Sequence, residues 1–314
     1  LFADDSALYK EIETIDDCYS LQRDLFKLQN WSHKWQMKFN VKKCKTLRIT
    51  RRTKHKINFH YRMSTPDDHS DTTDVPLPVQ NSATDELTIA PPNGYYTKLE
   101  EISHDKYLGV ILDNKLSFNQ HVDAISNKAT RLLNLCRRNL AFCSQEIKTN
   151  AYKSLIRPHL EYASPAWNPY TSRNIDKIEA IQRRAARFAL GYYTYGPDAQ
   201  LTNKITNQLK WQSLQHRRTL YDLSIFYKIL HNNINISFPP TVKPSPHHIN
   251  QFLHIQSLHS DAHKYSFYSR TIRIWNLLPS TVTNSTTIDT FKNQSAQWIS
   301  PLMWKKVNNT WTLI

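Results

Sequence analysis

The chain has 314 residues and carries 41 Lys and Arg against 26 Asp and Glu, so its formal net charge is +15 and its pI is near 9.6. This excess of cations favours a polyanionic partner, and nucleic acid fits better than a membrane because the sequence holds no long apolar run. The sequence shows no signal peptide and no C-x-x-C pair among its four cysteines, so we expect reduced thiols, no zinc site and a nuclear or cytoplasmic location.

The chain opens on an aromatic-x-Asp-Asp pattern at residues 2–5, set between short apolar stretches at 1–3 and 7–9. This arrangement predicts a hairpin with Asp4 and Asp5 at its tip. Two adjacent carboxylates in that position can hold Mg²⁺, the ion that two-metal enzymes use for in-line phosphoryl transfer. The alternative is an ordinary hairpin turn, in which Asp is common.

An amphipathic helix of about six turns is expected after this hairpin, because apolar residues recur there every three, four or seven positions. Thr14, followed three residues later by Asp17, predicts the N-cap of the helix. The residues that we expect on its buried face are Cys18, Leu21, Leu25, Leu28 and Trp35.

An Asn-x-x-Lys pattern, Asn40 to Lys43, follows the helix and precedes an expected strand at residues 47–50. The stretch 42–56 is strongly basic and contains no acidic residue. Such a run is either a solvated face or a surface for a nucleic-acid backbone, and the sequence gives the two interpretations equal weight. Its cations are Lys42, Lys43, Lys45, Arg48, Arg51, Arg52, Lys54 and Lys56.

Residues 64–101 have a different composition, because acidic residues alternate with Ser, Thr and Pro, and Lys98 is the only Lys or Arg. Such a stretch buries little apolar surface, so we expect a flexible surface insertion. A metal site among its acids is a minor alternative, since no spacing resembles a calcium loop.

A hairpin is predicted at residues 102–118, where Tyr107, Leu108 and Gly109 lead into an apolar strand. Glycine lets two backbones approach closely, although a buried strand with a bulge would also use it. Ser117 with Gln120 forms a capping-box pattern that predicts the start of the next helix. The exposed side of that helix is expected to carry Lys128, Arg131, Arg137 and Arg138.

Further helices are expected from Ser144 to Pro158, where proline should end the helix, and from about residue 175 to a C-cap at Gly191. One more helix, near residues 214–229, is followed by a Pro- and His-rich linker. The closing segment has no chemical role that we can assign, and we expect it to supply core aromatics or a partner surface. The apolar face of the helix before Gly191 comprises Ile175, Ile178, Ile181, Ala185 and Phe188, with Arg183, Arg184 and Arg187 beside it.

Taken in chain order, these patterns resemble the reverse transcriptases of non-LTR, LINE-type retrotransposons of the jockey-like kind. The strongest identifier is the Ile-Gln-Arg-x-Ala-x-Arg run at 181–187, which family members carry in very similar form. The resemblance covers most of residues 1–195 and about 265–292. It implies a polymerase that binds an RNA template, a DNA primer and a deoxynucleoside triphosphate.

The resemblance also implies roles for individual residues. Asp4 would be a ligand of a two-metal Mg²⁺ site and Asp5 its assistant. Lys43 would approach the triphosphate and protonate the departing pyrophosphate, with Lys42 and Lys45 as rivals. Tyr107, Leu108 and Gly109 would form the primer grip. The residues expected to hold nucleic-acid phosphates are Lys42, Lys45, Arg48, Arg51, Arg52, Arg183, Arg184 and Arg187.

We therefore expect an α+β chain in which part of a reverse-transcriptase palm, with short antiparallel strands and a helix, precedes a mainly helical thumb and a less ordered tail. The expected boundaries are palm 1–63, insertion 64–101, primer-grip hairpin 102–118, thumb 119–236, linker 237–264 and closing segment 265–314. A two-metal site needs carboxylates from more than one strand, so this chain alone is expected not to extend a primer. Two alternatives are a non-catalytic basic module that binds nucleic acid and the inert product of a decayed element.

Overall fold

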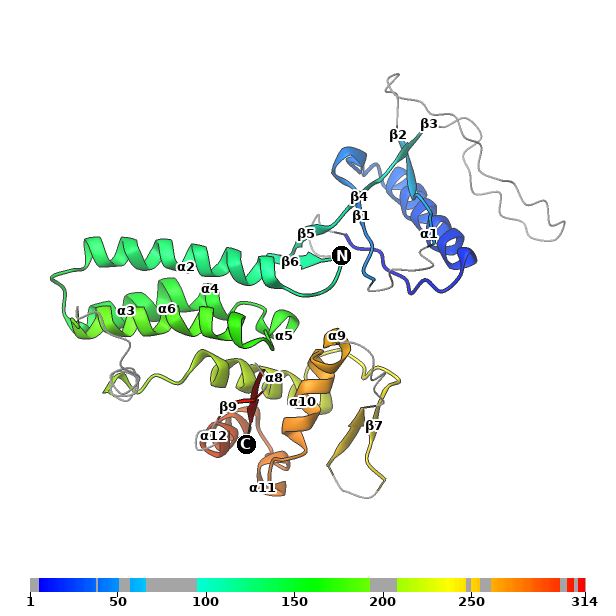
Figure 1. Cartoon of the computed structure of the whole chain (residues 1–314). Helices are drawn as coiled ribbons and strands as arrows, with labels where there is room; N and C mark the ends of the chain where they lie inside the picture. Colours follow the sequence, from blue (N-terminus) through cyan, green and yellow to red (C-terminus); the bar gives the residue numbers. More distant parts are fainter. Residues whose placement is uncertain are drawn as a thin grey trace. The chain divides into compact units, whose positions relative to one another are not determined.

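The computed structural model describes residues 6–37, 39–50, 57–65, 95–192, 208–246, 250–254, 261–299, 304–307 and 310–313, whose helices and strands are drawn in Figure 1. The chain divides into two compact units, residues 1–116 and 117–314. Helices are mixed with short two-stranded sheets in the described ranges, which agrees with the expected α+β class. No described helix is both long and apolar enough to cross a lipid bilayer.

The first unit combines one long helix with short strands. Its described elements are α1 (Ile15–Lys34), the 3₁₀ turn η1 (Val41–Lys43), β1 (Lys45–Leu47), β2 (Arg62–Thr65), β3 (Tyr95–Lys98), β4 (Glu100–Ile102), β5 (His104–Tyr107) and β6 (Val110–Asp113). β2 pairs with β3 and β5 with β6 in antiparallel register, whereas β1 and β4 run parallel. Val41, Met63 and Leu99 form a small buried core.

The N-terminus of α1 carries the predicted capping box. The Thr14 hydroxyl accepts a hydrogen bond from the Asp17 N–H (3.4 Å), and the Asp17 carboxylate accepts one from the Thr14 N–H (2.9 Å). The backbone and hydroxyl hydrogen bonds from Thr14 hold the pKa of Asp17 below its ordinary value. This start signal was therefore readable from two residues of the sequence.

The buried face of α1 is shifted by one position from the predicted one, because glutamines make the contact. Gln22 exchanges two hydrogen bonds with the backbone of Arg62 (2.8 and 2.9 Å), and Gln29 does the same with Ser64 (3.1 and 3.2 Å). A carboxamide has both a donor and an acceptor, so it satisfies a strand edge as a neighbouring strand would. The leucines expected on this face are only partly buried: Leu21, Leu25 and Leu28.

The segment predicted to be a flexible insertion begins and ends in regular structure. Arg62 to Thr65 in β2 pair residue by residue with Lys98 to Tyr95 in β3, and β4 follows at once. The two ends of the insertion therefore form an antiparallel stem. Residues 66–94 lie outside the described ranges.

The second unit is mainly helical. Its described elements are α2 (Asn119–Asn139), α3 (Gln145–Ala151), the π-helical turn η2 (Tyr152–Ile156), α4 (Arg157–Glu161), α5 (Ser164–Trp167), α6 (Ser172–Leu190), α8 (Leu214–Leu230), β7 (Val242–Pro244), β8 (Phe252–His254), α9 (Asp261–Lys264), α10 (Phe267–Trp275), α11 (Ser280–Thr283), α12 (Ile288–Ile299), β9 (Trp304–Val307) and β10 (Thr310–Leu313). α2 packs against α4 and α6, and α8 packs against α6, α10 and α12.

The start of α2 differs from the predicted one. The helix begins at Asn119, and its N-cap is Phe118, which has a left-handed backbone (φ 54°) and makes no side-chain capping bond. The capping box predicted from Ser117 and Gln120 is therefore not formed. Leu116 and Phe118 both have left-handed backbones (φ 50° and 54°), and a spacing rule cannot show such a conformation.

The helix expected to end at Pro158 instead continues through it. Ser144 caps α3 as predicted, since its hydroxyl accepts a hydrogen bond from the Ile147 N–H. The wide turns of η2 then reorganise the backbone hydrogen bonds, and Pro158 occupies one of the first positions of α4. Because proline lacks an N–H, it is tolerated where a helix starts anew.

The segment predicted to be a linker contains the antiparallel hairpin β7–β8, and Val242 and Phe252 of that hairpin are buried in the core of the second unit. The same core contains Trp275 and Phe291 from the closing segment, both fully buried. The expectation that the closing segment supplies core aromatics is confirmed. The described residues of this hairpin therefore belong to the packed second unit.

Candidate nucleic-acid interface

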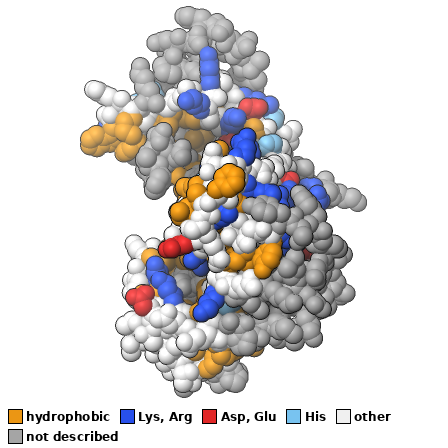
Figure 2. Space-filling view, turned by 90° about the vertical axis from the view of Figure 1, so that its left-hand side faces the viewer, with side chains coloured by type: hydrophobic (Ala, Val, Ile, Leu, Met, Phe, Trp, Pro, Cys, Tyr) orange, Lys and Arg blue, Asp and Glu red, His pale blue; other side chains and the backbone are white. Residues whose placement is uncertain are grey.

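α2 presents cations on its exposed side. Val122, Ala129, Leu133 and Cys136 are buried and recur at helical spacing, so they line one face of the helix. The opposite side carries four exposed cations, as predicted: Lys128, Arg131, Arg137 and Arg138. Figure 2 shows Lys and Arg spread over the described surface in that view, with few Asp and Glu among them.

Hydrogen bonds join α2 to α6 at the edge of the exposed side of α2. Asp123 accepts a hydrogen bond from Lys177 (2.5 Å), and Thr130 accepts one from the Arg184 guanidinium (3.2 Å). Arg137 lies seven residues after Thr130, which is two helical turns, so it projects from the same side of α2. We name the following four residues the α2–α6 basic surface: Arg131, Arg137, Arg138 and Arg184.

The Gln-Arg-Arg stretch of α6 splits between interior and exterior. Gln182 is buried and bonds to the Tyr152 hydroxyl and the Gln212 carbonyl, whereas Arg184 is exposed. Arg183 and Arg187 are half-buried. Of the three arginines predicted to bind phosphates here, Arg184 is thus the most accessible.

The Asn-x-x-Lys segment forms the short turn η1. The N–H of Lys43 donates to the Asn40 carbonyl (2.9 Å), and Val41 is buried while Lys43 is exposed. Lys42 and Lys45 are exposed as well. Burial therefore does not separate Lys43 from its rivals, and the catalytic role of this lysine stays a prediction.

The acidic end of the insertion partly neutralises the basic run. β1 lies at residues 45–47, earlier than the predicted strand, because it pairs with β4 and places Lys45 opposite Glu100. The Arg48 guanidinium forms an ion pair with Glu101 (3.2 Å) and donates to the carbonyls of Ile57 and Phe59. Arg48 is thus engaged within the protein. The other arginines of the predicted set, Arg51 and Arg52, lie outside the described residues.

The proposed primer-grip residues form a two-residue hairpin turn. Tyr107 pairs with Val110, and between them Leu108 and Gly109 both have positive φ, 46° and 84°. Hairpin turns of this kind match the twist of the strands, and glycine adopts the conformation freely, whereas leucine does so at a cost of about 1–2 kcal/mol. The register is regular, so the bulge alternative is wrong. Contact with a primer stays a prediction.

The predicted metal ligands, Asp4 and Asp5, lie outside the described residues. Within the described ranges no group of three or more His, Cys, Asp or Glu comes together as a metal site would require. Magnesium binding by the acidic pair therefore stays a prediction from the resemblance.

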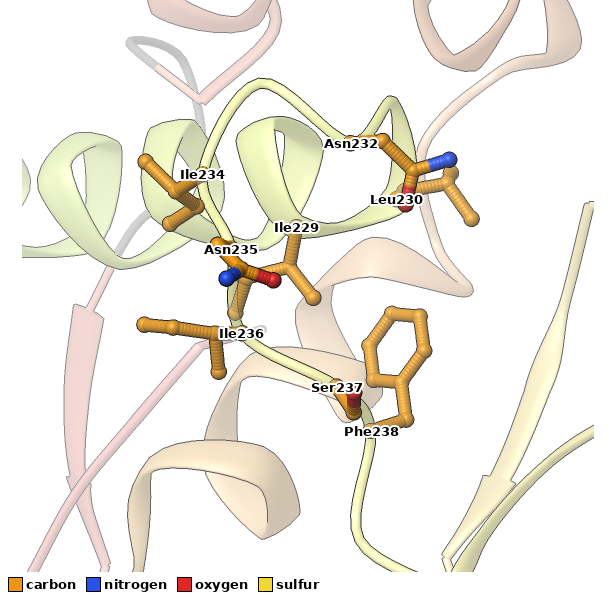
Figure 3. Close-up of a pocket in the computed structure, with 8 residues that line it drawn as sticks. All are labelled: Ile229, Leu230, Asn232, Ile234, Asn235, Ile236, Ser237 and Phe238. Atoms are coloured by element: carbon orange, nitrogen blue, oxygen red, sulfur yellow. The ribbon is translucent and has the colours of Figure 1, made fainter.

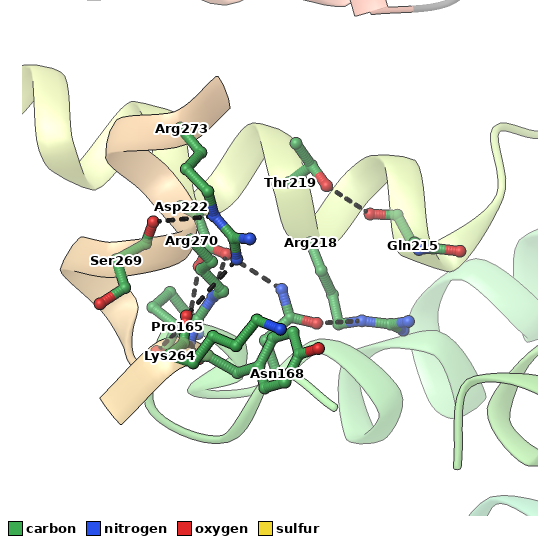
Figure 4. A network of polar contacts seen from close by, with 11 residues as sticks. Pro165, Asn168, Gln215, Arg218, Thr219, Asp222, Lys264, Ser269, Arg270 and Arg273 are labelled. Atoms are coloured by element: carbon green, nitrogen blue, oxygen red, sulfur yellow. Dashed lines mark hydrogen bonds and ion pairs between the residues drawn. The ribbon is translucent and has the colours of Figure 1, made fainter. Parts of the chain in front are cut away.

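A buried polar network fixes α8 to its neighbours (Figure 4). Asp222 accepts two hydrogen bonds from Arg270 (2.8 and 3.1 Å) and one from the Asn168 amide (2.9 Å). Arg218 donates to the Asn168 carbonyl oxygen (3.0 Å) and is fully buried. Arg270 also donates to the Pro165 carbonyl. The sequence shows that Arg218 is one of the basic residues of α8. Its helical spacing does not reveal that this side chain is buried.

A pocket of about 600 Å³ lies at the C-terminal end of α8 and the loop after it (Figure 3). Its lining combines aliphatic and aromatic side chains with Asn232, Asn235 and Ser237, and it includes no titratable side chain. Such a lining offers no group for acid–base chemistry.

The chain was compared with known proteins. No protein-family model matches it, and no solved structure matches it. It is 25% identical over 199 residues to a probable RNA-directed DNA polymerase from transposon X-element of Drosophila melanogaster, which is 60% of this chain and 18% of that protein. It is 27% identical over 192 residues to the RNA-directed DNA polymerase from mobile element jockey of Drosophila funebris, which is 59% of this chain and 17% of that protein.

A shorter match joins the chain to an uncharacterized protein of Caenorhabditis elegans, 25% identical over 123 residues, or 39% of this chain and 61% of that protein. The chain spans less than a fifth of the length of the two polymerases it matches. Over about 60% of its length, the chain is similar to RNA-directed DNA polymerases of mobile elements.

Proposed function

We propose that this chain is part of the RNA-directed DNA polymerase of a non-LTR retrotransposon, and that its second unit holds the duplex of RNA template and DNA primer. The similarity to the X-element and jockey polymerases is the observation that carries the first part. The α2–α6 basic surface supports the second part, because cations on the exposed sides of two packed helices suit contacts to phosphates without base readout.

The catalytic part of the proposal rests on the resemblance. Asp4 and Asp5 would hold Mg²⁺, and Lys43 would approach the triphosphate of the incoming nucleotide. The turn of Leu108 and Gly109 would contact the primer. The first unit would then carry the residues for nucleotide transfer, and the second unit would bind the hybrid of template and primer.

Binding of a labelled RNA–DNA hybrid, followed by fluorescence anisotropy over a salt series, tests the second unit. We expect affinity to fall steeply with salt and to depend little on sequence. Replacing Arg131→Gln and Arg138→Gln together should lower the slope of log K against log salt by about two, because each lost phosphate contact removes about one counterion. Both side chains are exposed, so the fold should be retained.

The matched control is the double variant Lys27→Gln and Lys292→Gln, which removes two exposed cations from α1 and α12. We expect it to keep the wild-type slope. An equal decrease of the slope in both double variants would mean that net charge alone drives binding. An affinity that does not change with salt would contradict the proposal.

A second candidate is a non-catalytic basic module derived from a mobile element. The α2–α6 basic surface favours it, because exposed cations on packed helices would serve such a module equally well. A hybrid with a recessed primer end separates the two candidates. A polymerase part should prefer it over a blunt hybrid of equal length, and a module that holds only the backbone should not.

A further inference from the structure

The second unit contains another, smaller pocket. The pocket has a volume of about 190 Å³ and lies where η2, α6 and the start of α8 meet. We propose that it binds one nucleotide unit, with the phosphate between lysines and the base against an indole ring. Its lining residues are Tyr152, Lys153, Arg157, Gln182, Lys210, Trp211, Gln212 and Arg217.

The pocket has an excess of positive charge. Arg217 pairs with both oxygens of the buried Glu161, and Arg157 lies 3.6 Å from the same carboxylate, so two cations share one anion. Lys153 and Lys210 are exposed and form no ion pair with any residue in the described ranges. Like charges that converge on one pocket repel one another, and a bound anion removes that repulsion.

An aromatic wall stands beside these cations. The indole of Trp211 stacks on the phenol ring of Tyr152 with centroids 4.3 Å apart and an interplanar angle of 17°. Tyr152 is 1% exposed, and its hydroxyl donates to Gln182 (2.7 Å), whose amide in turn donates to the Gln212 carbonyl (2.9 Å). Burial raises the pKa of Tyr152, so its hydroxyl is a neutral donor. The indole is thus supported from behind by a fixed, buried partner.

Two local features are typical of binding sites. η2 is a π-helical turn, and such turns are frequent at functional sites. Lys210 has a left-handed backbone (φ 52°), which a lysine adopts only at an energetic cost. The buried Nε1 of Trp211 lacks a hydrogen-bond partner among the described residues.

The volume and the lining of the pocket limit the class of ligand that can bind. The pocket is smaller than the roughly 300 Å³ at which sites for drug-sized molecules begin, so it suits a phosphate with part of one nucleotide. A base can stack on Trp211 only when it is not stacked in a duplex. The ligand is therefore a free nucleotide or a nucleotide of a single strand. The pocket shares no residue with the α2–α6 basic surface, so a nucleotide could bind there whether or not the second unit holds a hybrid.

Isothermal titration calorimetry of the full chain tests this pocket with three probes at fixed ionic strength: inorganic phosphate, thymidine 5′-monophosphate and an oligothymidylate of about ten nucleotides. We expect the double variant Lys153→Gln and Lys210→Gln to weaken binding of the nucleotide and the oligomer by about tenfold or more, because hydrogen bonds to a charged phosphate are lost. The control is Lys27→Gln with Lys292→Gln, which should bind as the wild type does.

The outcomes separate the sources of the ligand. Oligomer binding much tighter than nucleotide binding assigns the pocket to a single strand, and equal binding assigns it to a free nucleotide. Inorganic phosphate that binds as tightly as the nucleotide would contradict the role of Trp211. Equal affinities for the Lys153 and Lys210 double variant and for its control would overturn the proposal. Because these substitutions leave the α2–α6 basic surface intact, hybrid binding should keep its salt slope in either case.

Discussion

Gln182 and Arg184 lie two positions apart in one recognisable run, yet they face opposite environments. Gln182 is buried and joins Tyr152 to the backbone before α8, whereas Arg184 reaches across the surface to Thr130. Helical spacing predicted the apolar face of α6, and Ile175, Ile178 and Ile181 are indeed buried. Spacing cannot show which polar residue points inward, because that depends on partners far away in the sequence.

His121 provides a test at the scale of a single residue. It is 2% exposed and packs edge-on against Trp167 with ring centroids 4.9 Å apart. Burial lowers the pKa of His121 from 6.5 to about 4. The unfolded chain takes up a proton near pH 6.5, so the stabilisation is complete above that pH and is lost as the pH falls from 6.5 towards 4.

We therefore expect the free energy of unfolding to drop by on the order of 2 kcal/mol more in the wild type than in His121→Phe between pH 7 and pH 4.5. Urea titrations followed by circular dichroism measure this difference. An imidazole signal of His121 that titrates near pH 6.5 in NMR would show that the histidine is not buried as described.

At the scale of elements, start and stop signals gave mixed results for physical reasons. The Thr14 capping box, the Ser144 cap and the C-cap at Gly191 (φ 74°) were predicted correctly, because each depends on residues close in sequence. The predicted helix end at Pro158 was wrong, because the π-helical turn η2 lets α4 start anew with Pro158 at one of its first positions. Such a turn is stabilised by packing around the helix, which no local pattern encodes.

The ion pair between α8 and α10 yields a prediction at this scale. Asp222 is 3% exposed, and Arg270 binds it through two hydrogen bonds. Asp222→Asn should lower the free energy of unfolding by on the order of 3 kcal/mol, since it leaves a buried guanidinium without its counter-charge. Thermal unfolding followed by circular dichroism measures the loss.

The matched control for Asp222 is Asp289→Asn on α12, whose side chain is largely exposed and lies 3.8 Å from Lys292. An exposed pair of this kind contributes about 0–1 kcal/mol, so this variant should unfold almost as the wild type does. Similar losses in the two variants would show that the buried pair adds nothing beyond surface electrostatics.

At the scale of the whole molecule, local patterns predicted features that depend on residues close in sequence and missed those that depend on long-range packing. The basic helix faces and the hairpin at Leu108 and Gly109 were found from local residues. The hairpin of β7 and β8 was not predicted, because its Phe252 packs on Phe226 of α8, which also packs on Trp275 of α10, in a core built from segments on either side of the hairpin in the chain. Aromatic packing between segments far apart in the sequence therefore places Phe252 in the core.

The most direct measurement of nucleic-acid placement is photocrosslinking of the full chain to an RNA–DNA hybrid with a photoreactive base in the primer strand, followed by peptide mapping by mass spectrometry. We expect crosslinked peptides from α2 and α6, and their yield should fall in the Arg131→Gln and Arg138→Gln double variant but not in the Lys27→Gln and Lys292→Gln control. Crosslinks confined to other helices, with equal yield in both variants, would contradict the account.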